Sequence, residues 1–310
     1  MGVRWMAYLC CTLAMIGVGS TVVASKLIAA GLPPFTATAL RFAIALPIFI
    51  AIMRLRGERW PRPSRRDAAL LVLQAGSGSV GYTVFLLSGM RLTSATDAGV
   101  IAGTLPAVAA LVAVFALRER PSPVTLAALA LATSGVLVCT SGGSPAHAAP
   151  PAALGAAPRV FGNLLVVAAV FCEGFFILLN KRLSTPLSAL QMSTSMTGIG
   201  LVLALVPAFF ERPWALHADA AALAGVVYYA LVPTVAGFLL WFAGASRIAG
   251  AQASAFTAFV PVSAAALAAL VLRETMTPAQ WWGMGCVVGA VLLMAGEGVR
   301  TGMRRGVPAQ

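Results

Sequence analysis

The sequence predicts an all-α integral membrane protein whose ten transmembrane helices form two inverted five-helix repeats. Three observations lead to this fold class: an apolar composition, a repeat that spans the whole chain, and ten apolar runs. Hydrophobic residues make up 60% of the 310 residues and charged residues only 10%, against about 45–50% and about 25% in soluble domains. The solvent of most of this chain is therefore expected to be lipid.

The repeat has an offset of 155 residues. Leu-Arg-Glu at 117–119 recurs at 272–274. A proline lies at the equivalent position upstream of each copy, Pro106 in the first half and Pro261 in the second. Further identical pairs are Gly19 and Gly174, Lys26 and Lys181, Gly89 and Gly244, and Pro123 and Pro278. If each half crosses the membrane an odd number of times, the two halves must lie in opposite orientations, which is the architecture of secondary transporters.

The number of spans follows from the apolar runs, because a helix needs about 20 mostly apolar residues to cross the hydrocarbon core. Ten runs lie between polar or Pro/Gly breaks, five in each half. They cover approximately residues 5–25, 34–53, 67–88, 95–117, 123–140, 161–180, 187–210, 219–243, 249–272 and 278–298.

The basic residues indicate the orientation. With both termini in the cytoplasm, 15 of the 21 lysines and arginines lie in cytoplasmic segments and five outside, while Arg41 lies within a run. This bias agrees with the positive-inside rule. We expect a first repeat over 1–140, a flexible outer linker rich in Ala, Pro, Gly and Ser over 141–160, a second repeat over 161–298 and a cytoplasmic tail over 299–310.

Several other classes of protein lack support in the sequence. The net charge of +12 does not indicate nucleic-acid binding, because the basic residues cluster between apolar runs. The five cysteines and two histidines have no spacing typical of a metal site, and no Gly-rich phosphate loop is present. The apolar runs contain no Ser/His pair that would indicate an enzyme. The chain also has no sizeable extramembrane domain that would indicate a receptor. We expect no enzyme activity, metal, cofactor or nucleic-acid partner.

The turns after the fourth and ninth runs carry a family resemblance. Residues 117–123 and 272–283 resemble the short Glu-containing turns of the drug/metabolite transporter (DMT) superfamily, and within it the chain is most similar to the EamA-type ten-span exporters. Residues 234–251 resemble that group's eighth span and its following loop, and Thr93 to Ala95 resemble the matching loop of the first half. Arg41 lies where the family often has arginine, whereas Phe238 replaces a frequent tyrosine, so a polar role is lost there.

The resemblance implies a secondary transporter that exports small metabolites, amino acids first, by alternating access through a central cavity between the repeats. Efflux of cationic drugs or other amphipathic molecules is the alternative, because family members differ widely in substrate. The implied location is a bacterial inner membrane. The expected partners are a small-molecule substrate, the lipid bilayer and a coupling proton, in a monomer or a weak dimer.

Glu173 is the sharpest candidate for a functional residue. It lies within the sixth run, and an acidic side chain at the centre of a spanning helix costs roughly 2.5–3.5 kcal/mol, so such residues usually mark a substrate or ion route. Glu173 could bind a cationic amino group or carry the coupling proton. The structural alternative is a buried pair with Arg41 that locks two helices together.

Other candidates carry a hydroxyl, an amide or a polar-tipped ring within an apolar run. Aromatic walls with a few polar groups suit a small amphipathic ligand, although membrane aromatics also serve as interfacial anchors. We expect these residues to contribute to substrate binding or proton coupling: Gln74, Ser77, Tyr82, Thr104, Thr257, Tyr228 and Trp241.

A last group is predicted to kink helices or to gate the site. Pro106 and Pro261 occupy equivalent places in the fourth and ninth runs, where each leaves a carbonyl unpaired; the kinks either flex beside the site or are static. Glu119 and Glu274 end the same runs on opposite faces, where they either cap a neighbouring helix, pair with the adjacent arginine, or gate. Arg41 is assigned either to this group or to a purely structural role.

Overall fold

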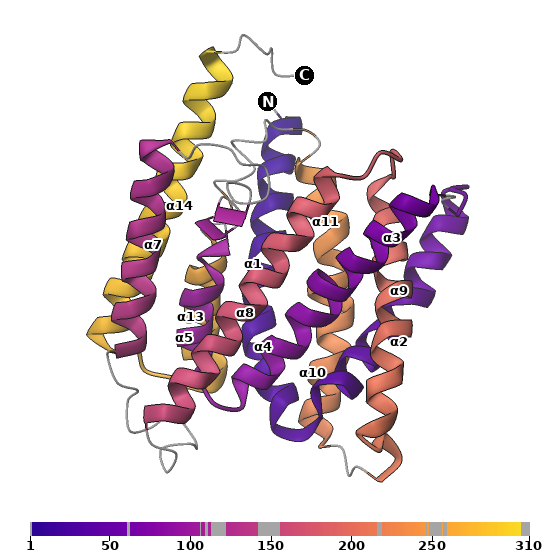
Figure 1. Ribbon diagram of the computed structural model, residues 1–310, viewed down its shortest axis with the longest axis horizontal. Coiled ribbons are helices and arrows are strands. Elements are labelled where there is room, and N and C mark those ends of the chain that lie inside the picture. The colour runs from indigo at the N-terminus through magenta and orange to yellow at the C-terminus, as the bar shows by residue number, and fades with distance from the viewer. Residues whose placement is uncertain are drawn as a thin grey trace.

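The computed structural model describes residues 2–60, 63–105, 107–108, 111–112, 122–141, 156–215, 219–245, 247, 256 and 259–304. In this part of the chain all regular elements are helical (Figure 1). The helices are α1 (Gly2–Gly31), α2 (Pro34–Leu55), α3 (Arg65–Gln74), η1 (Ala75–Gly81), α4 (Tyr82–Met90), α5 (Ala95–Ala102), α7 (Pro123–Ser141), α8 (Ala156–Lys181), α9 (Ala189–Phe210), η2 (Pro213–Ala215), α10 (Ala220–Tyr229), η3 (Ala230–Ala236), α11 (Gly237–Ala245), α13 (Phe259–Leu272) and α14 (Pro278–Arg304).

Local sequence explains where many of these helices begin. The first backbone N–H groups of a helix lack partners within it, and a Ser or Thr just before the first turn accepts from one of them. Ser188 caps α9 in a full capping box with Gln191, and Thr277 caps α14 in the same way with Gln280. The hydroxyls of Ser64, Ser94 and Ser122 cap α3, α5 and α7.

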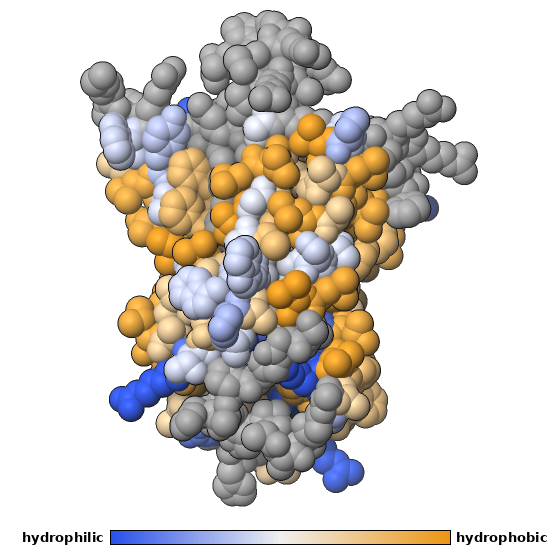
Figure 2. Space-filling view, turned by 90° about the vertical axis from the view of Figure 1, so that its left-hand side faces the viewer, coloured by the Kyte–Doolittle hydropathy of each residue, from blue (hydrophilic) through white to orange (hydrophobic). Residues whose placement is uncertain are grey.

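The helices have the length and composition of membrane spans. Among the described residues, six are long and apolar enough to cross a bilayer, over Trp5–Gly31, Pro34–Leu55, Arg65–Met90, Ala157–Asn180, Ala189–Phe210 and Ala220–Trp241. On the face shown in Figure 2, apolar side chains cover much of the described surface and the most hydrophilic ones lie towards its ends. The chain is an integral membrane protein.

The packing repeats when the two halves are exchanged. α2 packs against α9 and α7 against α14, so each of these pairs joins a helix to its own repeat partner. α1 packs against α11, as its repeat partner α8 packs against α4. α1 and α8 run in opposite directions, and α1 begins at the end of the molecule where α14 finishes (Figure 1). The predicted fold of ten helices in two inverted five-helix repeats is confirmed.

Some helices extend beyond the apolar runs that predicted them. α1 continues to Gly31 and α14 to Arg304. α8 begins at Ala156, inside the segment that we assigned to the linker. Its third residue is Pro158, and proline is tolerated in the first turn because that N–H has no partner within the helix. The remaining linker residues, 142–155, lie outside the described part of the chain.

Equivalent glycines allow close helix contacts. A Cβ on Gly89 of α4 would lie 2.8 Å from the carbonyl oxygen of Gly162 in α8. A Cβ on Gly244, its repeat partner in α11, would lie 2.7 Å from the carbonyl oxygen of Ala7 in α1. Both neighbours are backbone atoms that cannot rotate away, so small residues at this position hold the two halves together.

We therefore predict that Gly89→Ala destabilises the protein by about 1–3 kcal/mol, because the added methyl group forces α4 and α8 apart. Thermal unfolding in detergent measures the effect. Gly285→Ala is the control, since a Cβ on Gly285 meets no atom within 4 Å. An equal loss of stability in both variants would contradict the close-contact explanation.

Candidate functional site

Glu173 of α8 is a half-buried carboxylate without a direct partner. Among the described residues it forms no hydrogen bond, and no cation lies within 4.0 Å of it. Arg41, Tyr82 and Tyr229 are near enough to interact with it electrostatically. The buried Arg41–Glu173 ion pair that the sequence left open is therefore not formed in this conformation, and the carboxylate remains available to a ligand.

Arg41 of α2 is held by side chains of both repeats. Its Nε donates to the Thr234 hydroxyl at 3.1 Å and its Nη1 to the Thr83 hydroxyl at 2.8 Å. The guanidinium carbon also lies 4.3 Å from the centre of the Tyr229 ring and 4.8 Å from that of Phe42. A guanidinium has five N–H donors, so these two bonds leave donors for a ligand.

The two threonines lie at matching irregularities of the helices. η1 and η3 are π-helical segments whose bounds, Ala75–Gly81 and Ala230–Ala236, differ by the repeat offset of 155. The Thr83 hydroxyl donates to the carbonyl of Ser79 at 2.7 Å, and the Thr234 hydroxyl donates to that of Tyr229 at 2.8 Å. Each threonine thus uses its proton on its own backbone and offers its oxygen to Arg41. Such π-segments are frequent at functional sites.

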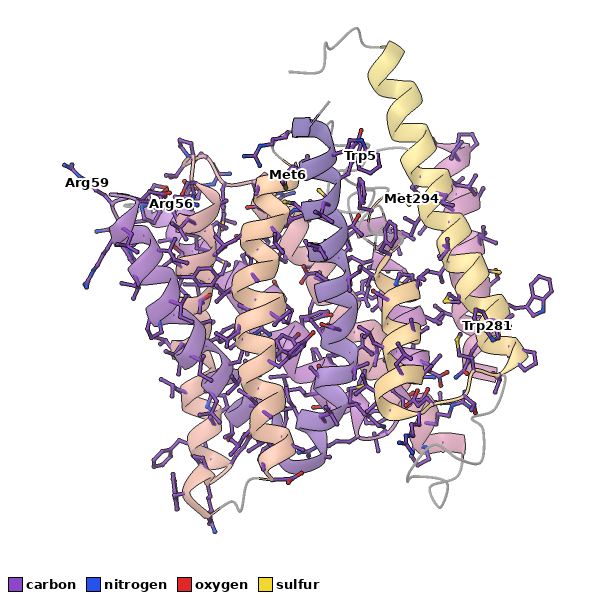
Figure 3. The ribbon with its side chains drawn as sticks, turned by 180° about the vertical axis from the view of Figure 1, so that it is seen from behind. Trp5, Met6, Arg56, Arg59, Trp281 and Met294 are labelled. Carbon is purple, nitrogen blue, oxygen red and sulfur yellow. The ribbon has the colours of Figure 1, made fainter. Side chains whose placement is uncertain are left out.

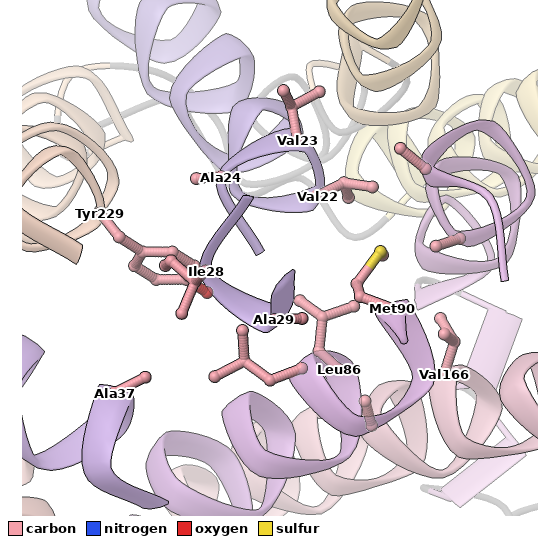
Figure 4. Close-up of a cluster of buried hydrophobic side chains, with 14 of the residues drawn as sticks. Val22, Val23, Ala24, Ile28, Ala29, Ala37, Leu86, Met90, Val166 and Tyr229 are labelled. Carbon is pink, nitrogen blue, oxygen red and sulfur yellow. The ribbon is translucent and has the colours of Figure 1, made fainter. Parts of the chain in front are cut away.

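Tyrosine rings complete what we call the central polar cluster. Tyr82 follows η1, and Tyr229 precedes η3. The hydroxyl of Thr21 in α1 lies beside both phenol groups. Tyr229 is almost fully buried, and it reaches from α10 towards Ile28 of α1 in the largest apolar cluster (Figure 4). The central polar cluster comprises Thr21, Arg41, Tyr82, Thr83, Glu173, Tyr229 and Thr234.

Four other predicted site residues lie outside this cluster. Gln74 is fully buried and donates to the carbonyl of Phe176 at 3.2 Å, which ties the third span to the sixth. Ser77 and Thr104 donate to carbonyls of their own segments. Trp241 packs against a separate apolar cluster that contains Ala14, Met15 and Val260.

The remaining tyrosine and the predicted gating residues also have defined places. Tyr228 is 41% exposed, and its hydroxyl donates to Ser20 at 2.9 Å. Pro261 is buried in α13 against Gly103. Pro106, Glu119 and Thr257 lie outside the described residues.

Glu274 caps a helix of the other repeat. Its carboxylate accepts from the backbone N–H groups of Ala95 and Thr96, both at 3.0 Å, and from the Thr96 hydroxyl at 2.8 Å. This is the helix-capping alternative of our sequence analysis. Glu211 at the end of α9 makes the same set of contacts with Phe35 and Thr36 at the start of α2. A carboxylate at a helix amino terminus is stabilised by the dipole and by charge-assisted bonds.

Buried ionic contacts join the repeats on the same face, opposite the termini. Asp97 of α5 pairs with Arg159 of α8 at 3.0 Å and accepts from Gln280 of α14 at 2.7 Å. Within the first repeat, Lys26 of α1 donates to the carbonyls of Met90 and Thr93 at the end of the third span. The contacts of Asp97, Glu274 and Glu211 connect the two halves at this face.

At the face that carries the termini, the described contacts are fewer. Asp67 of α3 accepts from the backbone and hydroxyl groups of Ser184 and Thr185, at 2.5–3.3 Å. Glu58 accepts from the hydroxyl of Ser188. Across the described residues, no three His, Cys, Asp or Glu side chains are grouped as metal ligands.

Inverted five-helix repeats that meet around a polar centre define the class of secondary transporters. The model of the EamA-like transporter family matches residues 5–141 and 160–296. The chain belongs to this family. It is a membrane transporter for a small-molecule substrate and not an enzyme.

Relatives of known sequence agree with this assignment. The chain is 32% identical over 289 residues to the Bacillus subtilis protein named uncharacterized transporter YetK, covering 93% of this chain and 86% of that one. It is 27% identical over 235 residues to a Streptantibioticus cattleyicolor protein named probable terminal-alkyne amino-acid exporter, covering 75% of each. It is 23% identical over 286 residues to the Escherichia coli protein named uncharacterized inner membrane transporter YedA, covering 89% and 86%.

One solved crystal structure has the same fold. Its TM-score is 0.62 at 19% sequence identity, and the match covers 97% of this chain and 99% of that chain.

The helix-capping role of Glu274 leads to a second prediction. Glu274→Ala leaves two buried N–H groups at the start of α5 unpaired, which costs about 1–3 kcal/mol for each group that water does not reach. Thermal unfolding of the purified protein should show a large loss of stability. Arg56→Ala is the control, because Arg56 is exposed at the end of α2 (Figure 3). Equal melting temperatures for wild type and Glu274→Ala would refute the capping role.

Proposed function

We propose that this protein exports small zwitterionic metabolites, with amino acids as the first candidates, from a bacterial cell across the inner membrane. The substrate binds in a central cavity between the repeats, with its carboxylate on Arg41 and its ammonium group on Glu173. The printed name of the Streptantibioticus cattleyicolor relative, an amino-acid exporter, supports this choice of substrate class.

The observation that carries the proposal is the pair of opposite charges at the centre of the cluster. Arg41 and Glu173 interact electrostatically but lie more than 4.0 Å apart. A carboxylate and a guanidinium in a low-dielectric interior strongly favour a partner of opposite charge. An amino acid has both charges on one small molecule, so it can satisfy both groups at once.

The surroundings of the two charges suit such a ligand. Tyr82 and Tyr229 provide aromatic surface with polar tips, and the hydroxyl of Thr21 lies between the phenols. Small-molecule sites usually combine apolar and aromatic walls with a few polar groups that orient the ligand. The ammonium group of a bound amino acid would also be stabilised by the tyrosine ring faces.

Proton coupling would use the same carboxylate. When the ammonium group leaves, Glu173 has no hydrogen bond or close ion pair with the described residues, and uptake of a proton would neutralise it. An exporter that exchanges substrate for a proton at Glu173 would be driven by the inward proton gradient.

Alternating access would require the faces of the molecule to open in turn. Breaking Asp97–Arg159 and the Glu274 cap would separate the repeats on the face opposite the termini, while the Asp67 contacts would hold the other face. The bias of basic residues in the sequence supports a cytoplasmic position for both termini. Relatives named inner membrane transporters support the proposed location.

A second candidate function is efflux of cationic drugs or other amphipathic molecules. Glu173 and the two tyrosine rings favour it, because a lone cation needs only a carboxylate and aromatic faces. In that case Arg41 would not contact the substrate.

Transport by the purified protein in liposomes tests the proposal and separates the two candidates. We expect uptake of radiolabelled amino acids that increases with an imposed pH gradient. Glu173→Gln should abolish the increase, and Arg41→Gln should lower transport efficiency by roughly 10- to 100-fold, the value of a hydrogen bond to a charged group. Thermal unfolding of each variant checks that it is folded.

Two outcomes would contradict the proposal. If no amino acid is transported by folded protein but an organic cation is, and Arg41→Gln does not affect that transport, the drug-efflux candidate replaces it. If amino-acid uptake is unaffected by the pH gradient and by Glu173→Gln, the protein remains a carrier, but Glu173 has no part in coupling.

The two threonines that hold Arg41 provide a further prediction. Thr83→Val and Thr234→Val each remove one hydrogen bond from the guanidinium while keeping the shape of the side chain, so KM should rise about 3- to 10-fold with little change in kcat. Thr→Ser at either position should restore KM. Thr38→Val is the control, because the Thr38 hydroxyl is buried and, among the described residues, bonds to the carbonyl of Pro34 in its own helix and to no other group. An equal rise of KM in the control would show that buried threonines act only through stability.

A further inference from the structure

A groove lies between α13 and α14, and none of its lining residues belongs to the central polar cluster. Its volume is about 580 Å³, within the range of about 300–1,000 Å³ typical of small-ligand sites. α13 packs mainly on α1 and α5, whereas α14 packs mainly on α7, so these two consecutive helices separate. The groove is lined by Val262, Ala265, Ala266, Ala269, Arg273, Glu274, Thr275, Met276, Trp281 and Met284.

The length of the groove matches one leaflet of a bilayer. Its lining extends along α13 from Val262 to Arg273, which is roughly 16 Å at 1.5 Å per helical residue. The hydrocarbon core of a membrane is about 30 Å thick. The groove therefore runs from the membrane surface opposite the termini to approximately the middle of the membrane.

The surface end of the groove carries an uncompensated positive charge. Arg273 is exposed and makes no hydrogen bond or ion pair with the described residues. Its backbone is left-handed, with φ 54°, a conformation in which a non-glycine residue is strained. The carboxylate of the adjacent Glu274 is already bonded to the amino terminus of α5. It forms no ion pair with Arg273.

Trp281 lies on the other wall near the same end, and 59% of it is exposed (Figure 3). Tryptophan at this depth is typical of the boundary between hydrocarbon and headgroups. The groove thus combines an apolar channel of one leaflet's depth with a cation and an indole at the headgroup level.

We propose that this groove is a binding site for an anionic phospholipid of the leaflet opposite the termini. One acyl chain lies along Val262, Ala266 and Ala269, and the phosphate binds Arg273. Arginine binds phosphate oxygens in a bidentate geometry. A lipid with a net negative charge is favoured, because a zwitterionic headgroup would bring a second cation to a site whose carboxylate is already bonded.

The experiment is native mass spectrometry of the purified protein with equal amounts of phosphatidylglycerol and phosphatidylcholine of identical acyl chains. We expect wild type to retain more phosphatidylglycerol, by about fivefold, which is the contribution of one basic residue at an anionic surface. Arg273→Gln should abolish this preference. Thermal unfolding without added lipid checks that each variant is folded.

Arg212→Gln is the matched control. Arg212 has φ 52°, is exposed and follows Glu211, which caps α2 as Glu274 caps α5, but it does not line the groove. This variant should keep the preference for phosphatidylglycerol. Ala269→Phe fills the groove and leaves Arg273 in place, so it should reduce retention of phosphatidylglycerol to the level of phosphatidylcholine.

Equal retention of the two lipids by wild type would overturn the proposal, as would an unchanged preference in Arg273→Gln. Equal loss of preference in Arg212→Gln and Arg273→Gln would also overturn it, because it would assign the effect to overall charge and not to the groove.

Discussion

The guanidinium of Arg41 must be satisfied inside a bilayer, and the centre of the molecule is arranged around this requirement. Water cannot supply the bonds there, so protein groups must. Two threonines do so, and each has an oxygen free to accept because its proton goes to a carbonyl at a π-segment. The π-segments and the position of the Tyr229 ring against the guanidinium contribute to the same arrangement.

Other acidic side chains of the described residues are satisfied by hydrogen bonds, and in this respect Glu173 differs from them. Glu211 and Glu274 bond to the first N–H groups of neighbouring helices, and Asp67 bonds to four donors of the 184–185 turn. In each case an acid that would destabilise a membrane protein instead stabilises a contact between the repeats. Glu173 lacks any such partner among the described residues. An unsatisfied carboxylate costs stability, and this contrast is the reason that we centre the proposed site on Glu173.

Much of the fold could be predicted from sequence, but little of the site. The offset between Leu117–Glu119 and Leu272–Glu274 and the apolar runs determine the span number and inversion, because a repeat and a hydropathy pattern are properties of the chain itself. Arg41 meets Thr83 and Thr234 across 42 and 193 residues, and no local pattern encodes such a contact. The π-segments leave only weak signals, namely three glycines in η1 and Pro233 in η3. Tyr229 contacts Arg41, whereas its neighbour Tyr228 bonds to Ser20, and the sequence does not distinguish these two adjacent tyrosines.

Positions related by the repeat offset keep the same residues or structure in the scaffold, but they differ at the central polar cluster. Pro106 and Pro261, the paired π-segments and the close-packed glycines follow the offset of 155 residues, whereas the counterparts of Arg41 and Glu173 are Met196 and Val18. A symmetric scaffold gives a carrier two related conformations, one open to each face. Two copies of each central charge would place like charges together in a low-dielectric interior. One arginine and one glutamate avoid this repulsion and make the centre asymmetric within a symmetric scaffold.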